Sequence, residues 1–93
     1  MFIHLAIHQP KPEHVDDLLA SMHRVDQAAQ GAPGLVQIGA WRDQGSDRLV
    51  GLALWESAEA FQASVGRIFQ AVADDPFDQW LQQPPDIFHL SQP

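Results

Sequence analysis

The chain has 93 residues, no Cys, and a formal net charge of −7 with only five Lys and Arg. This length predicts one domain over residues 1–93, and the lack of Cys excludes disulfides, thiolate metal sites and thiol nucleophiles. Nucleic acid is not an expected partner because phosphates would repel so acidic a chain, and no segment has the ~20 apolar residues that span a bilayer.

The N-terminal third is predicted to form a strand and a helix. Residues Phe2 to His8 alternate with a period of two, and no basic leader precedes them, so we expect a cytoplasmic protein. Pro10 and Pro12 end this strand. Apolar residues then recur at helical spacing from Glu13 to Gln30, and residues 31–34, with two Gly and one Pro, end the helix.

Two strands and a second helix are predicted next. Leu35–Arg42 and Arg48–Glu56 have strand character and are joined by a hairpin loop over residues 43–47. Ser57 has the chemistry of a helix N-cap. The helix is expected from about Ala58 to Ala73, because its apolar residues recur at spacings of three and four.

The C-terminal part is predicted to add a short helix and a last strand. Asp75 and Pro76 are typical of an N-cap and a first helical turn, and Asp86–Leu90 is the expected strand. The order is then β-α-β-β-α-β. Right-handed crossovers of this split βαβ pattern give a four-stranded antiparallel sheet with its helices on one face, so the predicted fold class is ferredoxin-like α+β.

Alternation along the four strands predicts two different sheet faces. One is aliphatic and contains Ile3, Leu5, Ile7, Val36, Ile38, Ala40, Val50, Leu52, Leu54, Phe88 and Leu90. The other mixes small, polar and aromatic groups: Phe2, His4, Ala6, His8, Gln37, Gly39, Trp41, Gly51, Ala53, Trp55, Ile87 and His89.

Neither face is suited to water, and two helices can cover only one of them. Leaving ten large apolar side chains exposed would forgo roughly 15–30 kcal/mol, which exceeds the ~5–15 kcal/mol by which whole domains are stable. The simplest cover is the same face of a second copy, so the sequence predicts a homodimer.

A short motif follows the third predicted strand. Trp55, Ser57, Ala60 and Phe61 form the pattern W-x-S-x-x-A-F, which resembles the antibiotic-biosynthesis-monooxygenase type of dimeric α/β barrel. The resemblance implies that two sheets close into one barrel and that the ligand pocket lies between sheet and helices. It therefore places the mixed face at the pocket and the aliphatic face at the dimer interface.

The mixed face then supplies a candidate pocket for a small aromatic ligand. Three histidines are candidate catalytic bases, since an ordinary pKa near 6.5 suits a base at neutral pH: His4, His8 and His89. Aromatic, small and polar groups are candidate binding residues: Gln37, Trp41, Gly51, Trp55, Phe61 and Met22, with Phe77 and Trp80 as a lid. A second interpretation stays open, in which the tryptophans are core and the histidines are merely hydrogen-bonded.

We expect neither a metal ion nor another cofactor. His4 and His8 are four residues apart on one strand, so about 13 Å separates their Cα atoms. One zinc ion at ~2.1 Å from both ring nitrogens would strain them. His89, on the strand expected to pair with the first, would meet only one of the two.

The resemblance implies an oxidative function, with departures from the family pattern. Some members oxidise phenolic polyketides to quinones with dioxygen and no cofactor. They use a Trp at the end of a strand, which Trp55 matches, together with an Asn and a Tyr or similar group. This chain has no Asn and no Tyr, and Gly51 and Phe61 lie near those positions. Other members open haem with an axial His on the second helix, where this chain has none.

The predicted function is cofactor-independent oxidation of a small aromatic or polyketide-like substrate. A non-catalytic small-molecule-binding or stress-associated dimeric barrel is the alternative. An isomerase on the same fold would also use a pocket His.

Overall fold

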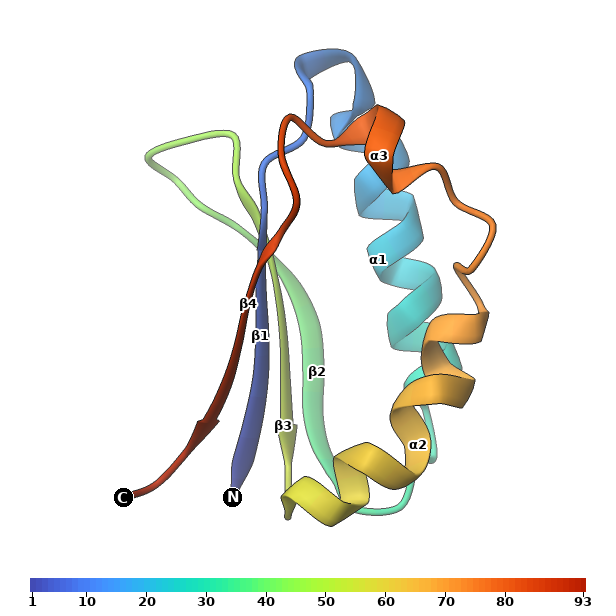
Figure 1. Cartoon of the computed structure of the whole chain (residues 1–93), viewed down its shortest axis with the longest axis vertical. Helices are drawn as coiled ribbons and strands as arrows, with labels where there is room; N and C mark the ends of the chain where they lie inside the picture. The colour runs from blue at the N-terminus through green and yellow to red at the C-terminus, as the bar shows by residue number, and fades with distance from the viewer.

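Four strands form one antiparallel sheet in the computed structural model, which describes residues 1–93 (Figure 1). They are β1 (Phe2–His8), β2 (Leu35–Arg42), β3 (Leu49–Trp55) and β4 (Asp86–Ser91), arranged in the order β2-β3-β1-β4. The two central strands are therefore β1 and β3, and both are rich in apolar residues. The predicted ferredoxin-like α+β fold is confirmed.

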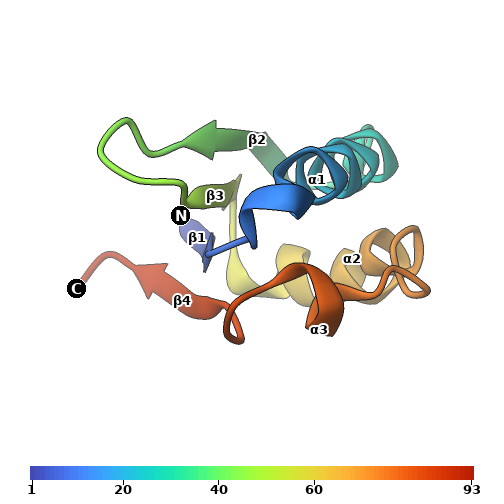
Figure 2. The ribbon, with the colours of Figure 1, turned by 90° about the horizontal axis from the view of Figure 1, so that it is seen from above.

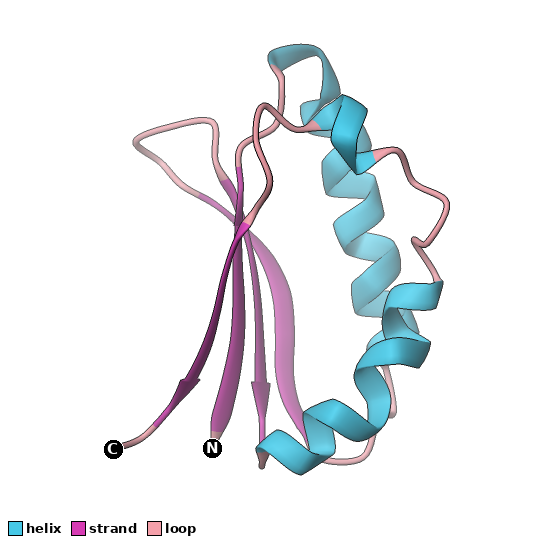
Figure 3. Ribbon diagram, viewed as in Figure 1, coloured by secondary structure: helices cyan, strands magenta, loops and turns pink.

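All the helices lie on one side of this sheet (Figures 2 and 3). A 3-10 turn, η1 (Pro12–His14), leads into α1 (Val15–Ala29), and the second half adds α2 (Ala58–Gln70) and the short α3 (Phe77–Trp80). The first long helix thus begins two residues later than the pattern predicts, and the second ends three residues earlier. None of the helices combines the length and apolar character that crossing a membrane requires.

The W-x-S-x-x-A-F motif joins β3 to α2 through a cap and a close contact. The Ser57 hydroxyl accepts a hydrogen bond of 3.1 Å from the backbone N–H of Ala60, which satisfies one free donor of the first turn. Gly34, with φ +83°, lies so close to Ala60 that a Cβ added to it would be 2.6 Å from the Ala60 Cβ. Small residues at both positions allow α2 to begin against the start of β2.

A β-bulge near the start of β2 reverses the expected orientation of that strand. The pairing shifts between Leu35 and Gln37, so that Ile38 lies opposite Ala53, while Trp41 lies opposite Val50. One extra residue inverts the alternation of every side chain after it. Ile38 therefore faces the helices, whereas Gln37 and Trp41 face away from them, opposite to the prediction.

The side of the sheet without helices is mostly apolar, with Gln37 and Asp86 as polar exceptions, and we call it the open face. The pairing places these side chains on it: Ile3, Leu5, Ile7, Trp41, Val50, Leu52, Leu54, Phe88 and Leu90. Trp41 is 55% exposed, and Phe88 and Leu90 are also exposed. No element of this chain covers these side chains.

Candidate functional site

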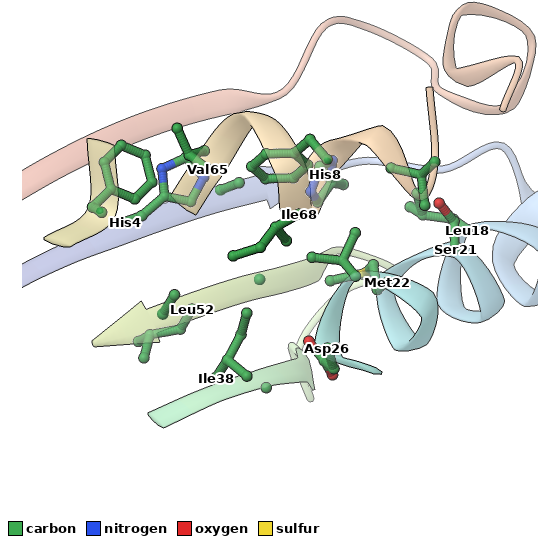
Figure 4. A pocket seen from close by; sticks show the side chains of 18 of the residues that line it. His4, His8, Leu18, Ser21, Met22, Asp26, Ile38, Leu52, Val65 and Ile68 are labelled. Atoms are coloured by element: carbon green, nitrogen blue, oxygen red, sulfur yellow. The ribbon is translucent and has the colours of Figure 1, made fainter. Parts of the chain in front are cut away.

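A cavity of about 90 Å³ lies between the sheet and the helices (Figure 4). Its wall is mostly hydrophobic. Met22 reaches it from α1 and Ile68 from α2, while β1 contributes His4 and His8 on the sheet side. On the sheet side, β3 contributes Gly51, which has no side chain. A Cβ added to Gly51 would be 3.5 Å from the Met22 Cε, so the Met22 methyl group bounds the cavity at this point.

His4 is held in one position by a histidine on the neighbouring strand. The two residues are opposite each other in the β1–β4 pairing, and the His4 Nδ1 is 3.0 Å from the His89 Nε2. The His4 ring also stacks on Phe61, with centroids 5.1 Å apart and 22° between the planes. The Phe of the motif therefore supports the pair, because it also packs edge-on against His89 at 5.3 Å.

Burial keeps the cavity histidines neutral. The pKa of His4 lies below its ordinary value of 6.5, because burial disfavours the charged ring and because His89 and His8 lie near it. Burial alone lowers the pKa of His8. Both rings are therefore favoured in the neutral form at neutral pH, in which one nitrogen of each ring carries a lone pair, as a general base requires.

Two buried ring nitrogens in the cavity wall have no hydrogen-bond partner. They are the Nδ1 of His8 and the Nε1 of Trp55, and Trp55 is only 2% exposed. Buried polar groups are normally paired, so an unpaired donor or acceptor beside a cavity is a group that a bound molecule can satisfy. The two lie near opposite ends of β1, because Trp55 pairs with Phe2 and His8 pairs with Leu49.

The structure brings together most, but not all, of the residues predicted for the site. Those that line the cavity are His4, His8, Met22, Gly51, Trp55, Phe61 and Phe77. His89 is exposed and hydrogen-bonds to His4 rather than lining the cavity.

Three predicted binding residues lie elsewhere. Gln37 and Trp41 are on the open face because of the bulge in β2. Trp80 packs edge-on against Phe77 at 5.7 Å and belongs to a cluster with Leu81, so only Phe77 of the predicted lid reaches the cavity. The predictions that place Gln37, Trp41 and Trp80 in the pocket wall are wrong.

One acidic wall residue is absent from the sequence prediction. Asp26 lines the cavity from α1, one turn after Met22, and burial raises the pKa of its carboxyl group while nearby His23 partly opposes that shift. The spacing of four residues from Met22 puts Asp26 on the same helix face and is the signal that could have identified it. No group of three or more His, Cys, Asp or Glu side chains is arranged to hold a metal ion.

Comparison with known proteins gives one family and many similar folds. A family model described as "Antibiotic biosynthesis monooxygenase" matches residues 1–68. No curated protein matches the chain.

The structure of Rv0793 from Mycobacterium tuberculosis is similar, with a TM-score of 0.84 and 16% identity over 98% of this chain and 93% of that one. PA3566 from Pseudomonas aeruginosa has a TM-score of 0.79 and 14% identity over 98% of this chain and 92% of that one. A variant of MhuD with two manganese protoporphyrin IX molecules in each active site has a TM-score of 0.77 and 19% identity over 99% and 94% of the two chains. At these identities the likenesses establish the fold alone.

Proposed function

The chain belongs to the antibiotic biosynthesis monooxygenase family, and we propose that it oxidises a small phenol to a quinone with dioxygen in the cavity between sheet and helices. The observation that supports this most strongly is His4, which lines an apolar cavity and is hydrogen-bonded to His89 on the neighbouring strand. Phenols lose a proton before they react readily with dioxygen, so the site needs a neutral base in surroundings that exclude water.

One direction of the hydrogen bond to His89 leaves the other nitrogen of His4 able to act as the base. When the His4 Nδ1–H donates to the Nε2 of His89, the Nε2 of His4 keeps its lone pair and can take the phenol proton. The same hydrogen bond then stabilises the imidazolium that forms. His8 and Trp55 offer unpaired nitrogens that can orient the substrate.

The proposed reaction balances with dioxygen as the only co-substrate. The phenolate gives one electron to dioxygen, and the two radicals combine at the ring carbon para to the oxygen. The peroxide that results takes the proton back from His4 and loses water as the para C–H proton leaves and the O–O bond breaks. For 1-naphthol the products are one 1,4-naphthoquinone and one water for each dioxygen consumed.

The acid limb of the pH profile tests the base. Because the pKa of His4 lies below 6.5, the midpoint of the acid-side decline in kcat/KM should lie below pH 6.5. The titratable groups near His4 are His89 and His8, while the α2 residues beside it are uncharged and include Phe61 and Phe69. Initial rates of 1-naphthol oxidation between pH 5 and 8 give the profile. A midpoint at or above 6.5 would show that His4 is not the base.

A second candidate function is binding without chemistry. The observation that favours it is the lack of any Asn or Tyr, since Gly51 and Phe61 lie near the positions where the family resemblance requires those groups. An isomerase would use the same histidine. Haem degradation gains no support, because α2 contains no His to bind iron axially. Binding of a phenol without dioxygen uptake would identify the non-oxidative alternatives.

We further propose that two copies pair through their open faces to form a homodimer. A contiguous apolar surface over the central strands of a sheet is unusual on a monomer. A two-fold arrangement would bury the same side chains of both copies, as isologous interfaces do. The helices already cover the opposite face, so pairing would enclose each sheet on both sides without blocking the cavity walls that α1 and α2 form.

A further inference from the structure

We infer that the cavity selects an uncharged aromatic ligand and discriminates against carboxylates, sulfonates and phosphates, with Asp26 as the residue that sets this selectivity. Oxidation of such a ligand rests on the proposed function, but binding of the ligand does not.

The wall contains no positive side chain that could pair with an anion. Its ionisable groups are His4, His8 and Asp26, and no Lys or Arg is among its lining residues. A carboxylate that enters an apolar cavity loses its hydration and needs a counter-charge in return. This wall offers none.

The few cations of the chain are placed elsewhere. Arg24 pairs with Asp75, and Arg67 donates to the Ala28 carbonyl at 3.3 Å. Arg42 and Arg48 border a shallow hollow on the open face, and Lys11 precedes η1 on the surface. None of them lines the cavity.

The histidines do not replace these cations at neutral pH. Both cavity histidines are partly buried, and the pKa of each lies below the ordinary value, so the rings are neutral there. They offer a hydrogen bond to a phenol and no charge to a carboxylate.

Asp26 is the wall residue that discriminates between anionic and uncharged ligands. Its side chain reaches the cavity from α1 (Figure 4), and no hydrogen bond or ion pair holds its carboxyl oxygens. As a carboxylate, Asp26 repels a second anion at the cavity wall, whereas an uncharged ligand meets no such repulsion. The residue therefore disfavours anionic ligands without hindering uncharged ones.

The size of the cavity limits the ligand to a small ring system. An apolar protein cavity of about 150 Å³ holds benzene. The cavity in this protein is smaller, at about 90 Å³. It therefore accommodates part of one aromatic ring, and the rest of the ligand extends toward the opening of the cavity. A two-ring phenol is a suitable probe because it extends beyond the enclosed space.

Binding of 1-naphthol and 1-naphthoate, measured by calorimetry near pH 7.5, tests the inference with a matched pair of ligands. We expect the wild-type protein to bind 1-naphthol at least about tenfold more tightly than 1-naphthoate. Asp26→Asn should strengthen 1-naphthoate binding by about tenfold and leave 1-naphthol within about threefold.

Asp16→Asn is the matched control. The substitution changes the net charge by the same amount, and Asp16 lies on the same helix but does not line the cavity. It should leave both affinities unchanged. Equal binding of the two ligands, failure of both to bind, or equal effects of the two Asn variants would overturn the inference. Selective binding of 1-naphthol without any dioxygen uptake would instead reject the proposed oxidation and leave the inference in place.

Discussion

Replacing His4 by Ala should lower the rate of 1-naphthol oxidation by about 10²–10⁴-fold, the range that a lost general base typically causes. Ala has no lone pair to take the phenol proton, and His89 is exposed and does not line the cavity. Binding of 1-naphthol should weaken much less than the rate falls, since the apolar wall remains. Dioxygen uptake and calorimetry on the same preparation measure the two effects.

The matched control for this substitution is His14→Ala. His14 lies in η1 and makes one exposed contact, with Asp17 at 2.9 Å. Its loss should leave oxidation unchanged. Thermal unfolding of both variants shows whether the fold is intact. If His4→Ala keeps a rate within a few-fold of the wild type, another group takes the proton and the His4–His89 pair is only structural.

Replacing Leu5 by Asp should convert a dimer into a monomer. Leu5 lies at the centre of the open face, with Leu52 and Phe88 opposite it on the two neighbouring strands. An unpaired carboxylate buried at an interface costs several kcal/mol, so the dissociation constant should rise by at least about 100-fold. Sedimentation velocity at micromolar concentration measures the change.

Leu5→Met is the control for the dimer, because it keeps the volume and the apolar character of the side chain. It should sediment like the wild type, at twice the 10.3 kDa of one chain. Trp41→Asp tests the same interface independently of the monomer core, since Trp41 is already 55% exposed on one chain. A wild-type protein that sediments at 10.3 kDa would contradict the proposed dimer directly.

The fold could be predicted from the sequence because local patterns agree with one another. Alternating strands, a capped second helix and turn residues between elements all indicate the same βαββαβ order. The W-x-S-x-x-A-F motif indicates the family, and the structure gives two of its residues a physical role. Ala60 allows a close approach to Gly34, and Phe61 packs against His4 and His89. Each of these features depends on residues near one another in the chain.

The site was only partly predictable, because two of its determinants are not local. A single bulge after Leu35 inverts the rest of β2, and strict alternation therefore places Gln37 and Trp41 on the wrong face. Pairing of His4 with His89 depends on the register of β1 against β4, which turn lengths alone do not give. Asp26 was missed for a different reason: helix patterns are built from apolar residues, so a lone acid on the inner face is overlooked.

Dioxygen uptake by the wild-type protein, treated with a metal chelator and supplied with 1-naphthol at neutral pH, is the most direct test of a cofactor-independent oxidation in this cavity. The account predicts consumption above the buffer rate, with one 1,4-naphthoquinone formed per dioxygen and near-complete loss in His4→Ala. Calorimetric binding of 1-naphthol with no uptake above buffer would contradict it, and the protein would then be a binding barrel whose histidines orient a ligand without transforming it.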